Sequence, residues 1–396
     1  MATASARRQW IEANASQPLT AATVLTLRRQ IGESAAREWL ELAKLQPKAR
    51  KKFGDGVWMA TARSIEQASN HIVAAYKASL MGDRIVVDLC GGIGGDAMGY
   101  ARRGGVITID QDPQMTRMAA ENLRSIGAQQ AIAVCADAAT YFSPATFASH
   151  RVGLHLDPDR RPNDQRTSAP EEYQPSWATV SAMLQAASAS LVKLAPAAVL
   201  DEAIGDRYHR QWISFAGTVR EQLLIGGQCI DAARVATRAR SAIRLMKDGR
   251  RWLFQATDRE HSECRFDAVP EPLSYLIDLD PAVRAAGLSA RFAEAHCLGC
   301  LGDPSGFFTC DRLPAESALM QRFECVWSGP ADRKLIRKQI ATKGLRLQIV
   351  KIRGTEHDPA RFLKSLSLPK TPDGDVAALM LGRRGHAVYA VLGKPC

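Results

Sequence analysis

The chain has 396 residues, of which 46% are hydrophobic and 23% charged, as expected of a globular protein with two or three domains. Its formal net charge of +11 at pH 7 indicates an acidic partner, and favours nucleic acid over a membrane surface. We expect no membrane span, because no apolar run reaches roughly 18 residues, and no signal peptide, because the start of the chain has no apolar block. Nine scattered cysteines indicate reduced thiols in the cytoplasm.

The first 80 residues are expected to form a helical region. Apolar residues recur with helical spacing over Thr23–Leu42, with a break at Gly32. The segment Pro47–Lys52 is predicted to be a basic linker that contacts either phosphate or solvent. A further helix is predicted over Ser64–Leu80, with a capping pattern at its start.

The most informative segment joins an apolar strand to a glycine-rich loop. Residues 86–96 read Val-Val-Asp-Leu-Cys-Gly-Gly-Ile-Gly-Gly-Asp, with four glycines within five positions. Glycine permits a sharp turn and a close approach to a ligand, and a helix predicted over Asp96–Arg103 directs its N-terminal amides at that ligand. A second apolar strand, Val106–Ile109, ends at Asp110, 22 residues after Asp88. Strand, glycine loop, helix, strand and acid form one βαβ nucleotide-binding unit.

Two cofactors use this geometry. The spacing Gly92-x-Gly94-x-x-Ala97 fits the loop that holds the pyrophosphate of NAD(P). Asp88 argues against that ligand, because a carboxylate at the mouth of the loop would meet the pyrophosphate with like charge. S-adenosylmethionine (SAM) has no phosphate and carries an ammonium and a sulfonium group, so the carboxylate favours SAM. NAD(P) stays open as the alternative.

The segment Asp88–Gly95 resembles motif I of class I SAM-dependent methyltransferases. The resemblance implies that Asp110 holds the ribose hydroxyls and that Asp137, which closes a third apolar strand over Ala131–Asp137, faces the adenine amino group. Cys90 is expected to pack rather than to act as a nucleophile. The cofactor-binding residues implied are Asp88, Cys90, Gly91, Gly92, Gly94, Gly95, Asp110 and Asp137.

A fourth apolar strand, Val152–Leu156, ends at Asp157 and Pro158. In doubly wound sheets, side chains at the carboxyl ends of strands meet the ligand. The turn resembles half of the Asn/Asp-Pro-Pro-aromatic motif of methyltransferases that act on amino groups of bases, because Asp159 replaces the second proline and an arginine the aromatic residue. We expect Asp157 and Pro158 at the catalytic centre. The expected substrate contacts are Arg160, Arg161 and Tyr173, with Trp177 as the other candidate for stacking on a base.

The remaining residues are predicted to complete this sheet and to form a third region. For the sheet, we predict a helix over Val180–Leu194 and strands over Ala197–Leu200, Gly227–Val235 and Arg251–Ala256. In the third region, we predict strands over Phe323–Trp327 and Arg346–Arg353, helices over Asp332–Lys343 and Pro359–Ser365, and a hairpin that joins Val376–Leu381 to Ala387–Leu392.

The third region is basic. From Asp332 to Lys370 there are eleven Lys and Arg residues against three Asp and Glu residues. This excess fits either a surface that follows nucleic-acid phosphates or a solvated basic face. Four cysteines offer a possible zinc site, but their second pair is 15 residues apart rather than close, so we expect no metal. They are Cys297, Cys300, Cys310 and Cys325.

Together these segments resemble bacterial class I SAM methyltransferases that carry a C-terminal THUMP-like domain, near the trimethylguanosine synthase branch. The segments that carry the resemblance are Ser64–Ser69, Asp88–Asp96, Asp157–Arg161, Tyr275–Val283 and Leu347–Gly354. The resemblance implies an α/β fold with an N-terminal helical region over 1–80 and a Rossmann-like methyltransferase sheet over 81–268. A C-terminal region over 269–396 would include the α/β THUMP-like domain, over 320–396.

We therefore expect a cytoplasmic SAM-dependent methyltransferase that methylates a nucleotide of tRNA or rRNA, with RNA as its partner and without a membrane or a metal. Two alternatives stay open. The incomplete motif after the fourth strand also fits a pseudo-methyltransferase that only binds RNA. The second alternative is a methyltransferase that acts on a protein or a small molecule.

Overall fold

The computed structural model describes residues 3–141, 143–159, 168–201, 204, 207–263, 268–302, 306–368 and 374–396. Contacts divide the chain into two compact units. The N-terminal unit consists of Met1–His209 and Glu221–Thr237, and the C-terminal unit of Arg210–Arg220 and Arg238–Cys396. The division at residues 80 and 268 that the sequence suggests stays a prediction. Within the described ranges, we find no helix that is both long and apolar enough to cross a membrane.

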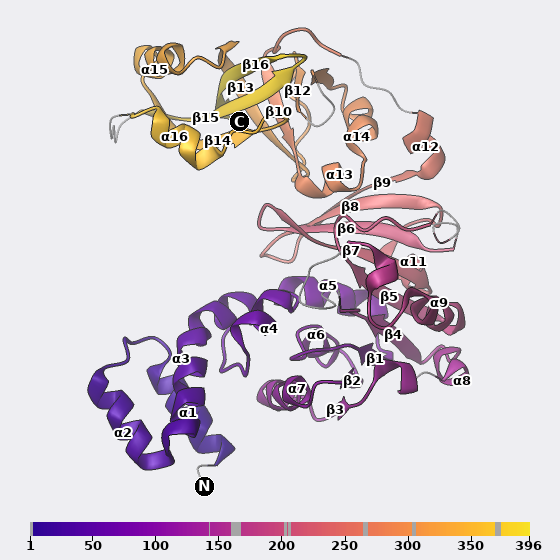
Figure 1. Ribbon diagram of the computed structural model, residues 1–396. Helices are drawn as coiled ribbons and strands as arrows, with labels where there is room; N and C mark the ends of the chain where they lie inside the picture. The colour runs from indigo at the N-terminus through magenta and orange to yellow at the C-terminus, as the bar shows by residue number, and fades with distance from the viewer. Residues whose placement is uncertain are drawn as a thin grey trace. The chain divides into compact units, whose positions relative to one another are not determined.

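The chain begins with helices, as predicted, up to the start of the first strand (Figure 1). They are α1 (Ala4–Asn14), α2 (Ala21–Ile31), α3 (Glu33–Phe53), α4 (Ala62–Gln67) and α5 (His71–Met81). Gly32, with φ at 83°, separates α2 from α3 where the sequence predicts a break. The predicted linker Pro47–Lys52 is wrong, because the buried face of α3 continues through Ala49 to Phe53 and keeps the helix intact around its proline. The single helix predicted over Ser64–Leu80 is two helices, because the side chain of Asn70 caps a new helix at the amide of Ile72.

The sheet of the N-terminal unit has the strand order β3-β2-β1-β4-β5-β7. Its strands are β1 (Ile85–Leu89), β2 (Val106–Asp110), β3 (Ala131–Cys135), β4 (Val152–Leu156), β5 (Ala189–Leu194) and β7 (Thr218–Gly227), which begins in the C-terminal unit. The first five are parallel, and β7 is antiparallel to β5. The order reverses between β1 and β4, so the carboxyl ends of these two strands form the topological switch point at which such sheets bind ligands.

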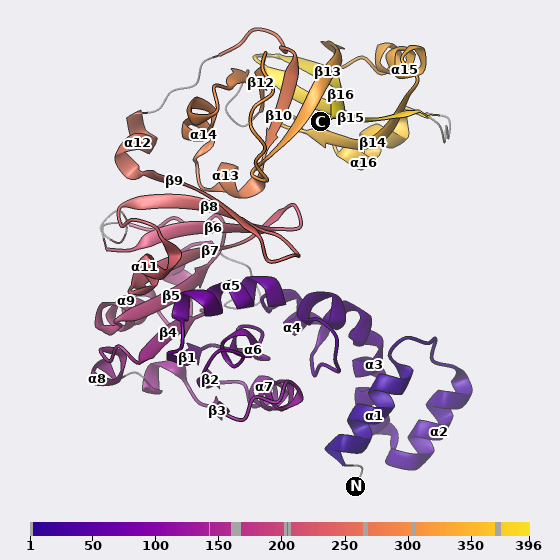
Figure 2. The same cartoon turned by 180° about the vertical axis from the view of Figure 1, so that it is seen from behind.

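Helices cover both faces of this sheet. Figures 1 and 2 show α5 to α7 on one side of the strands and α8 and α9 on the other. The helices are α6 (Ala97–Tyr100), α7 (Pro113–Ser125), α8 (Pro144–Phe147), α9 (Trp177–Ala186) and α11 (Cys229–Ala233), with 3₁₀ turns at Ala138–Tyr141 and Pro170–Glu172. The four predicted apolar strands are confirmed, whereas the helix predicted over Asp96–Arg103 is shorter, since α6 ends at Tyr100.

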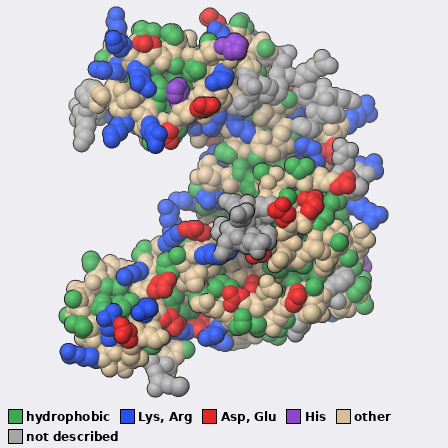
Figure 3. Space-filling view, in the orientation of Figure 1, with side chains coloured by type: hydrophobic (Ala, Val, Ile, Leu, Met, Phe, Trp, Pro, Cys, Tyr) green, Lys and Arg blue, Asp and Glu red, His purple; other side chains and the backbone are tan. Residues whose placement is uncertain are grey.

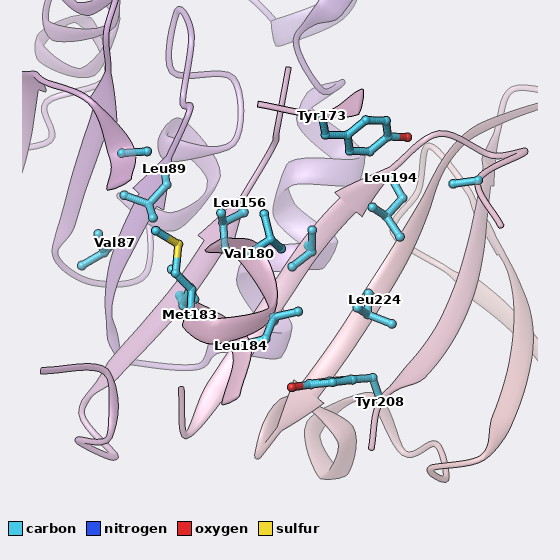
Figure 4. Close-up of a cluster of buried hydrophobic side chains, with 14 of the residues drawn as sticks. Val87, Leu89, Leu156, Tyr173, Val180, Met183, Leu184, Leu194, Tyr208 and Leu224 are labelled. Carbon is cyan, nitrogen blue, oxygen red and sulfur yellow. The ribbon is translucent and has the colours of Figure 1, made fainter. Parts of the chain in front are cut away.

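A buried apolar cluster lies directly beneath the switch point (Figure 4). It joins Leu89 of β1 and Leu156 of β4 to Val180, Met183 and Leu184 of α9, all at most 3% exposed. Burial of each such side chain stabilises the fold by about 1.5–3 kcal/mol. The cluster therefore fixes the strand ends from which the functional loops emerge.

Several elements predicted after residue 180 differ in the structure. The helix predicted over Val180–Leu194 ends at Ala186, and its second half is strand β5. All six residues of β5 are buried, and periodicity does not distinguish a fully buried strand from a buried helix. The strand predicted over Gly227–Val235 contains helix α11, and Ala197–Leu200 forms no regular element, whereas the strand predicted over Arg251–Ala256 is confirmed.

The C-terminal unit contains β6 (His209–Phe215), β8 (Ala239–Leu245) and β9 (Arg251–Thr257) and a second sheet of order β11-β12-β10-β13-β16-β15-β14. The strands of this second sheet are β10 (Tyr275–Leu279), β11 (Gly299–Leu301), β12 (Phe307–Cys310), β13 (Met320–Pro330), β14 (Leu345–Ile352), β15 (Asp375–Arg384) and β16 (Ala387–Pro395). The helices are α12 (Asp258–Glu263), α13 (Pro281–Ala285), α14 (Ser289–Ala295), α15 (Arg333–Thr342) and α16 (Pro359–Ser365). The strands, helices and hairpin predicted after residue 320 are confirmed.

Helix α15 shows how the basic bias of the C-terminal unit reaches its surface. Ile336 and Ile340 are buried, whereas the cationic side chains are exposed. These are Arg333, Lys334, Arg337 and Lys338. Figure 3 shows Lys and Arg side chains over much of the face of this unit that is in view. Among the residues described, no group of three or more His, Cys, Asp or Glu side chains is arranged to hold a metal ion.

Candidate cofactor and substrate site

The glycine loop after β1 is shaped by steric limits at particular positions. A Cβ atom on Gly91 would lie 1.9 Å from Oγ1 of Thr108 and 2.7 Å from Oδ2 of Asp88, so no side chain fits there. Gly92 and Gly94 have φ values of 56° and 82°, in the left-handed region that glycine adopts without strain. The loop therefore packs closely against the ends of β1 and β2 at Gly91.

A polar row crosses three neighbouring strands beneath this loop. Because β1 pairs in parallel with β2 and β4, Asp88 lies opposite Thr108 on one side and His155 on the other. Oδ2 of Asp88 accepts a hydrogen bond from the Thr108 hydroxyl at 2.9 Å, and Oδ1 lies 2.6 Å from Nδ1 of His155. Since an ionised carboxylate only accepts, Nδ1 carries the proton.

The structure corrects the expected position of Asp88. Its carboxylate does not stand at the open mouth of the loop: its side chain is fully buried, beneath the loop. The register of three strands places two polar partners against it, and their hydrogen bonds offset the cost of burial. The negative charge of Asp88 therefore acts on the loop from below.

The other two acids at strand ends differ in their surroundings. Asp110 is half-buried at the end of β2, where Oδ2 accepts a hydrogen bond from the Gly92 amide at 2.8 Å. Burial raises the pKa of Asp110, although hydrogen bonds from the amides of Asp112 and Gly92 oppose the rise. Asp137, after β3, is exposed and accepts a hydrogen bond from the Ala139 amide at 2.9 Å. Asp110 is thus tied to the glycine loop, and Asp137 is open to solvent.

The surroundings of Cys90 show that negative charge gathers at the glycine loop. It packs against the apolar cluster, as expected from the sequence. Burial raises the pKa of its thiol, and the charges of four carboxylates raise it further, so the thiol stays protonated. The carboxylates are Asp110, Asp157, Asp88 and Asp159. Convergent negative charge around the glycine loop fits a cationic ligand such as SAM and opposes a pyrophosphate.

A buried ion network anchors the far end of the loop. Asp96, directly after the last glycine, lies with Oδ1 2.8 Å from Nζ of Lys77 on α5. The same ammonium is 2.9 Å from Oε1 of Glu221 on β7 and donates to the hydroxyl of Ser69 at 3.1 Å. Ser69 in turn donates to Oδ2 of Asp96 at 2.8 Å, and Nε2 of His155 lies 4.0 Å from that oxygen. The network joins α5, the glycine loop, β4 and β7.

The charges around Lys77 and Asp96 hold these two side chains in the ionised state. Burial would lower the pKa of Lys77, but the carboxylates of Asp96 and Glu221 outweigh it and raise the pKa. Burial would likewise raise the pKa of Asp96, but the charges of Lys77, His155 and Lys193 together with a hydrogen bond from Lys77 outweigh it and lower the pKa. Breaking such a buried pair leaves a charge without compensation, so the arrangement resists movement of the loop.

The turn after β4 carries a second ion pair. Leu156 of β4 lies opposite Val192 of β5 in parallel register, so the next residues, Asp157 and Lys193, are neighbours. Nζ of Lys193 lies 2.6 Å from Oδ2 of Asp157 and donates to the backbone oxygen of Gln67 at 3.3 Å. The side chain of Lys193 is 4% exposed and that of Asp157 is 24% exposed. The lysine is therefore an internal support, whereas the carboxylate faces the site.

The predicted substrate contacts are only partly placed. Asp159 pairs with Gln174 through two backbone hydrogen bonds of 2.8 and 3.2 Å, which fixes the turn after Pro158. Tyr173 is not an exposed stacking surface as expected: its side chain is 2% exposed and packs in the core (Figure 4). The antiparallel bridge to Asp159 draws its segment onto the sheet. Trp177 is partly buried against the same core. Arg160 and Arg161 lie outside the described residues.

Sequence reasoning missed the side chains that support the site. The structure adds His155, Lys77, Glu221, Ser69 and Lys193 to it. A signal was present at His155, the one polar side chain of an otherwise apolar strand, and at Lys193, the one charged residue of its strand. A buried polar residue needs a partner, but the identity of that partner depends on strand register.

Comparisons with known proteins find similarity to methyltransferases. Residues 83–155 match the family described as RNA cap guanine-N2 methyltransferase. The chain is 26% identical over 355 residues to an uncharacterised S-adenosylmethionine-dependent methyltransferase of Mycobacterium tuberculosis, covering 86% of this chain and 92% of that protein. Its fold matches a crystal structure of a proposed methyltransferase from Porphyromonas gingivalis W83, with a TM-score of 0.77, 19% identity and coverage of 99% and 98% of the two chains.

Proposed function

We propose that this chain, which is a SAM-dependent methyltransferase, transfers the methyl group to an amino group of a nucleobase in RNA. The match of residues 83–155 to the RNA cap guanine-N2 methyltransferase family is the observation that carries the choice of RNA. The turn that begins at Asp157, two residues beyond the matched segment, supports the choice of an amino group. The net charge of +11 agrees with a polyanionic substrate.

The chain supplies a site of matching charge for the cofactor. SAM, when bound, provides a methyl group on a positively charged sulfur. Gly91 and Gly94 permit the tight path of the loop, and Gly92, with open space where a Cβ atom would stand, would allow the cofactor to approach the backbone closely. Asp110 would accept hydrogen bonds from ribose hydroxyls and Asp137 from the adenine amino group. The buried charge of Asp88 would favour the cation across the loop.

The ion pair of Asp157 and Lys193 would orient the nucleophile. Lys193 engages Oδ2 of Asp157, and Oδ1 receives no hydrogen bond from any residue in the described ranges. This free oxygen would accept an N–H of the amino group, and Pro158 would hold the turn rigid. Alignment of the nitrogen lone pair with the methyl group is the main contribution of such a site. The proton leaves to water after attack, so no strong base is required.

The test is methyl transfer to RNA with tritiated SAM, followed by mass spectrometry of the nucleosides. We expect label in an N-methylated base and a loss of about 10²–10³-fold in transfer rate for D157A, since one charged hydrogen-bond partner at the reacting centre is removed. The affinity for SAM, measured by isothermal titration, should change little in D157A. The matched control for D157A is D159A. Asp159 also follows β4, but it is anchored through backbone hydrogen bonds that do not use its side chain.

Other outcomes would redirect the assignment. RNA that shifts in a gel yet gains no label would identify a pseudo-methyltransferase. Label in protein or in a small molecule, without salt-sensitive binding to RNA, would move the substrate outside nucleic acid. Saturation by NADH in place of SAM would contradict the cofactor itself.

A further inference from the structure

A second charged cluster lies within the C-terminal unit. Asp278 of β10 is buried, with 4% of its side chain exposed, and three cations surround it. Nη2 of Arg284 lies 3.0 Å from Oδ1, and Nζ of Lys351 lies 2.7 Å from Oδ2. Arg353 contributes Nη2 at 3.2 Å from Oδ2 and Nε at 3.3 Å from Oδ1.

The cluster holds more positive charge than its carboxylate balances. Three cations against one carboxylate leave a net charge of +2. The neighbouring acid, Asp280, already has a cation of its own, because Arg244 lies 3.5 Å from its Oδ2. Excess charge that is partly removed from water is costly unless an anion compensates it. The excess is therefore a feature that a bound anion would stabilise.

Two of the three cations, Lys351 and Arg353, are held in place by Asp278 and have N–H groups left to donate to a ligand. Arg284 is mainly structural, since it also donates to the backbone oxygens of Gly306 at 2.8 Å and Leu279 at 3.4 Å. Lys351 uses one of its three N–H groups on Asp278, and Arg353 uses three of its five on Asp278 and the backbone oxygen of Ile352. Within the described ranges, the other N–H groups of Lys351 and Arg353 have no acceptor.

Aromatic rings fix the same two side chains. Nζ of Lys351 lies 5.8 Å from the ring centroid of Phe323, and the guanidinium of Arg353 lies 5.8 Å from that of Phe307. Both rings belong to the apolar cluster inside this sheet. Cation–π contact and ion pairing together lower the entropy cost of binding a ligand. The exposed fractions, 11% for Lys351 and 31% for Arg353, place the cationic groups at the border of solvent.

We infer that Lys351 and Arg353, oriented by Asp278, form an anion seat that binds a phosphate group of the RNA substrate. The inference rests on the RNA substrate proposed above. Phosphate is the fitting anion because a guanidinium fork beside an ammonium offers several charged donors to tetrahedral oxygens. Lys351 lies near the carboxyl end of β14 and Arg353 follows it, and the 31% of the Arg353 side chain that is exposed is open to an approaching phosphate.

The experiment measures binding without SAM, so that methyl transfer does not enter the result. Fluorescence anisotropy with a labelled 20-nucleotide single-stranded RNA gives Kd as a function of KCl concentration for the full chain, K351Q, R353Q and the double variant. The matched control is R346Q, which removes one exposed cation from the same strand. We expect the double variant to raise Kd about tenfold and to lower the slope of log Kd against log salt by about 0.7–1.4. R346Q should change both far less.

A second probe is first applied to the wild-type chain, so that a misfolded variant cannot affect its result. Inorganic pyrophosphate should compete with the RNA and broaden its own ³¹P signal with the wild-type chain. If R346Q lost as much affinity for RNA as the double variant, the anion seat would be overturned, because the result would show a diffuse basic surface. Absence of binding to both RNA and pyrophosphate would overturn it as well. Pyrophosphate binding that depends on Arg353, without binding to RNA, would support an anion seat for free phosphates and refute the RNA assignment.

Discussion

The buried ion network around Lys77 yields a quantitative prediction. K77M removes a cation that is 0% exposed and lies 2.8 and 2.9 Å from the carboxylates of Asp96 and Glu221, themselves 6% and 2% exposed. Breaking a buried pair costs about 3–5 kcal/mol, and here two acids lose one shared partner. We therefore expect a loss of about 4 kcal/mol, or roughly 8–16 °C in the unfolding midpoint of a unit of this size.

The assay is thermal unfolding followed by tryptophan fluorescence at pH 7, with K48M as the matched control. Lys48 lies 2.7 Å from Glu66, a distance as short as in the network, but both side chains are at least 50% exposed. Such a surface pair contributes about 0–1 kcal/mol, so K48M should lower the midpoint by less than about 4 °C.

A second variant separates lost charge balance from lost packing. K77M combined with D96N and E221Q removes all three charges while preserving the shapes of the acids. The triple variant should therefore recover at least half of the decrease in unfolding midpoint that K77M causes. The reasoning would be refuted if K77M behaved like K48M, or if the triple variant were no more stable than K77M alone.

Two further predictions concern charge balance and pH. K193M and D157N should each reduce methyl transfer by at least about 30-fold, because each leaves one charge of a pair separated by 2.6 Å without its partner, whereas the double variant should return to within about tenfold of wild type; multiplying effects would contradict this coupling. The charge of Lys77 lowers the pKa of Asp96 against the effect of burial, so the stability that Asp96 contributes is fully present above its ordinary pKa of about 3.9 and is lost as the pH falls toward the folded-state value. Unfolding midpoints from pH 6 to pH 3 should therefore fall more steeply in wild type than in D96N, and parallel curves would contradict the prediction.

The glycine loop shows how far local pattern can be trusted. Residues 86–96 predicted strand, loop and helix in the right order, because glycine spacing and the apolar run act over only a few residues. The same local reasoning misplaced the carboxylate of Asp88. Its burial depends on Thr108 and His155, which lie 20 and 67 residues away and reach it only through strand pairing.

Strand β5 shows why the substrate side was less predictable. We predict a helix over its fully buried residues, which leaves Lys193 without a position beside Asp157. Tyr173 was expected on an exposed polar loop, but backbone bridging between Asp159 and Gln174 draws it into the core. Both errors concern contacts that no local pattern encodes.

For this protein, the sequence alone determined the glycine loop between strand and helix, the acids at the strand ends and the basic character of the C-terminal unit. Each of these is a property of neighbouring residues, since turns, strand ends and charge density are short-range. Only the tertiary structure decided which buried groups face each other: Lys77 with Asp96 and Glu221, Lys193 with Asp157, and Asp278 with its three cations. Strand register and helix packing bring these partners together from distant parts of the chain, and burial makes their charges interact strongly enough to matter.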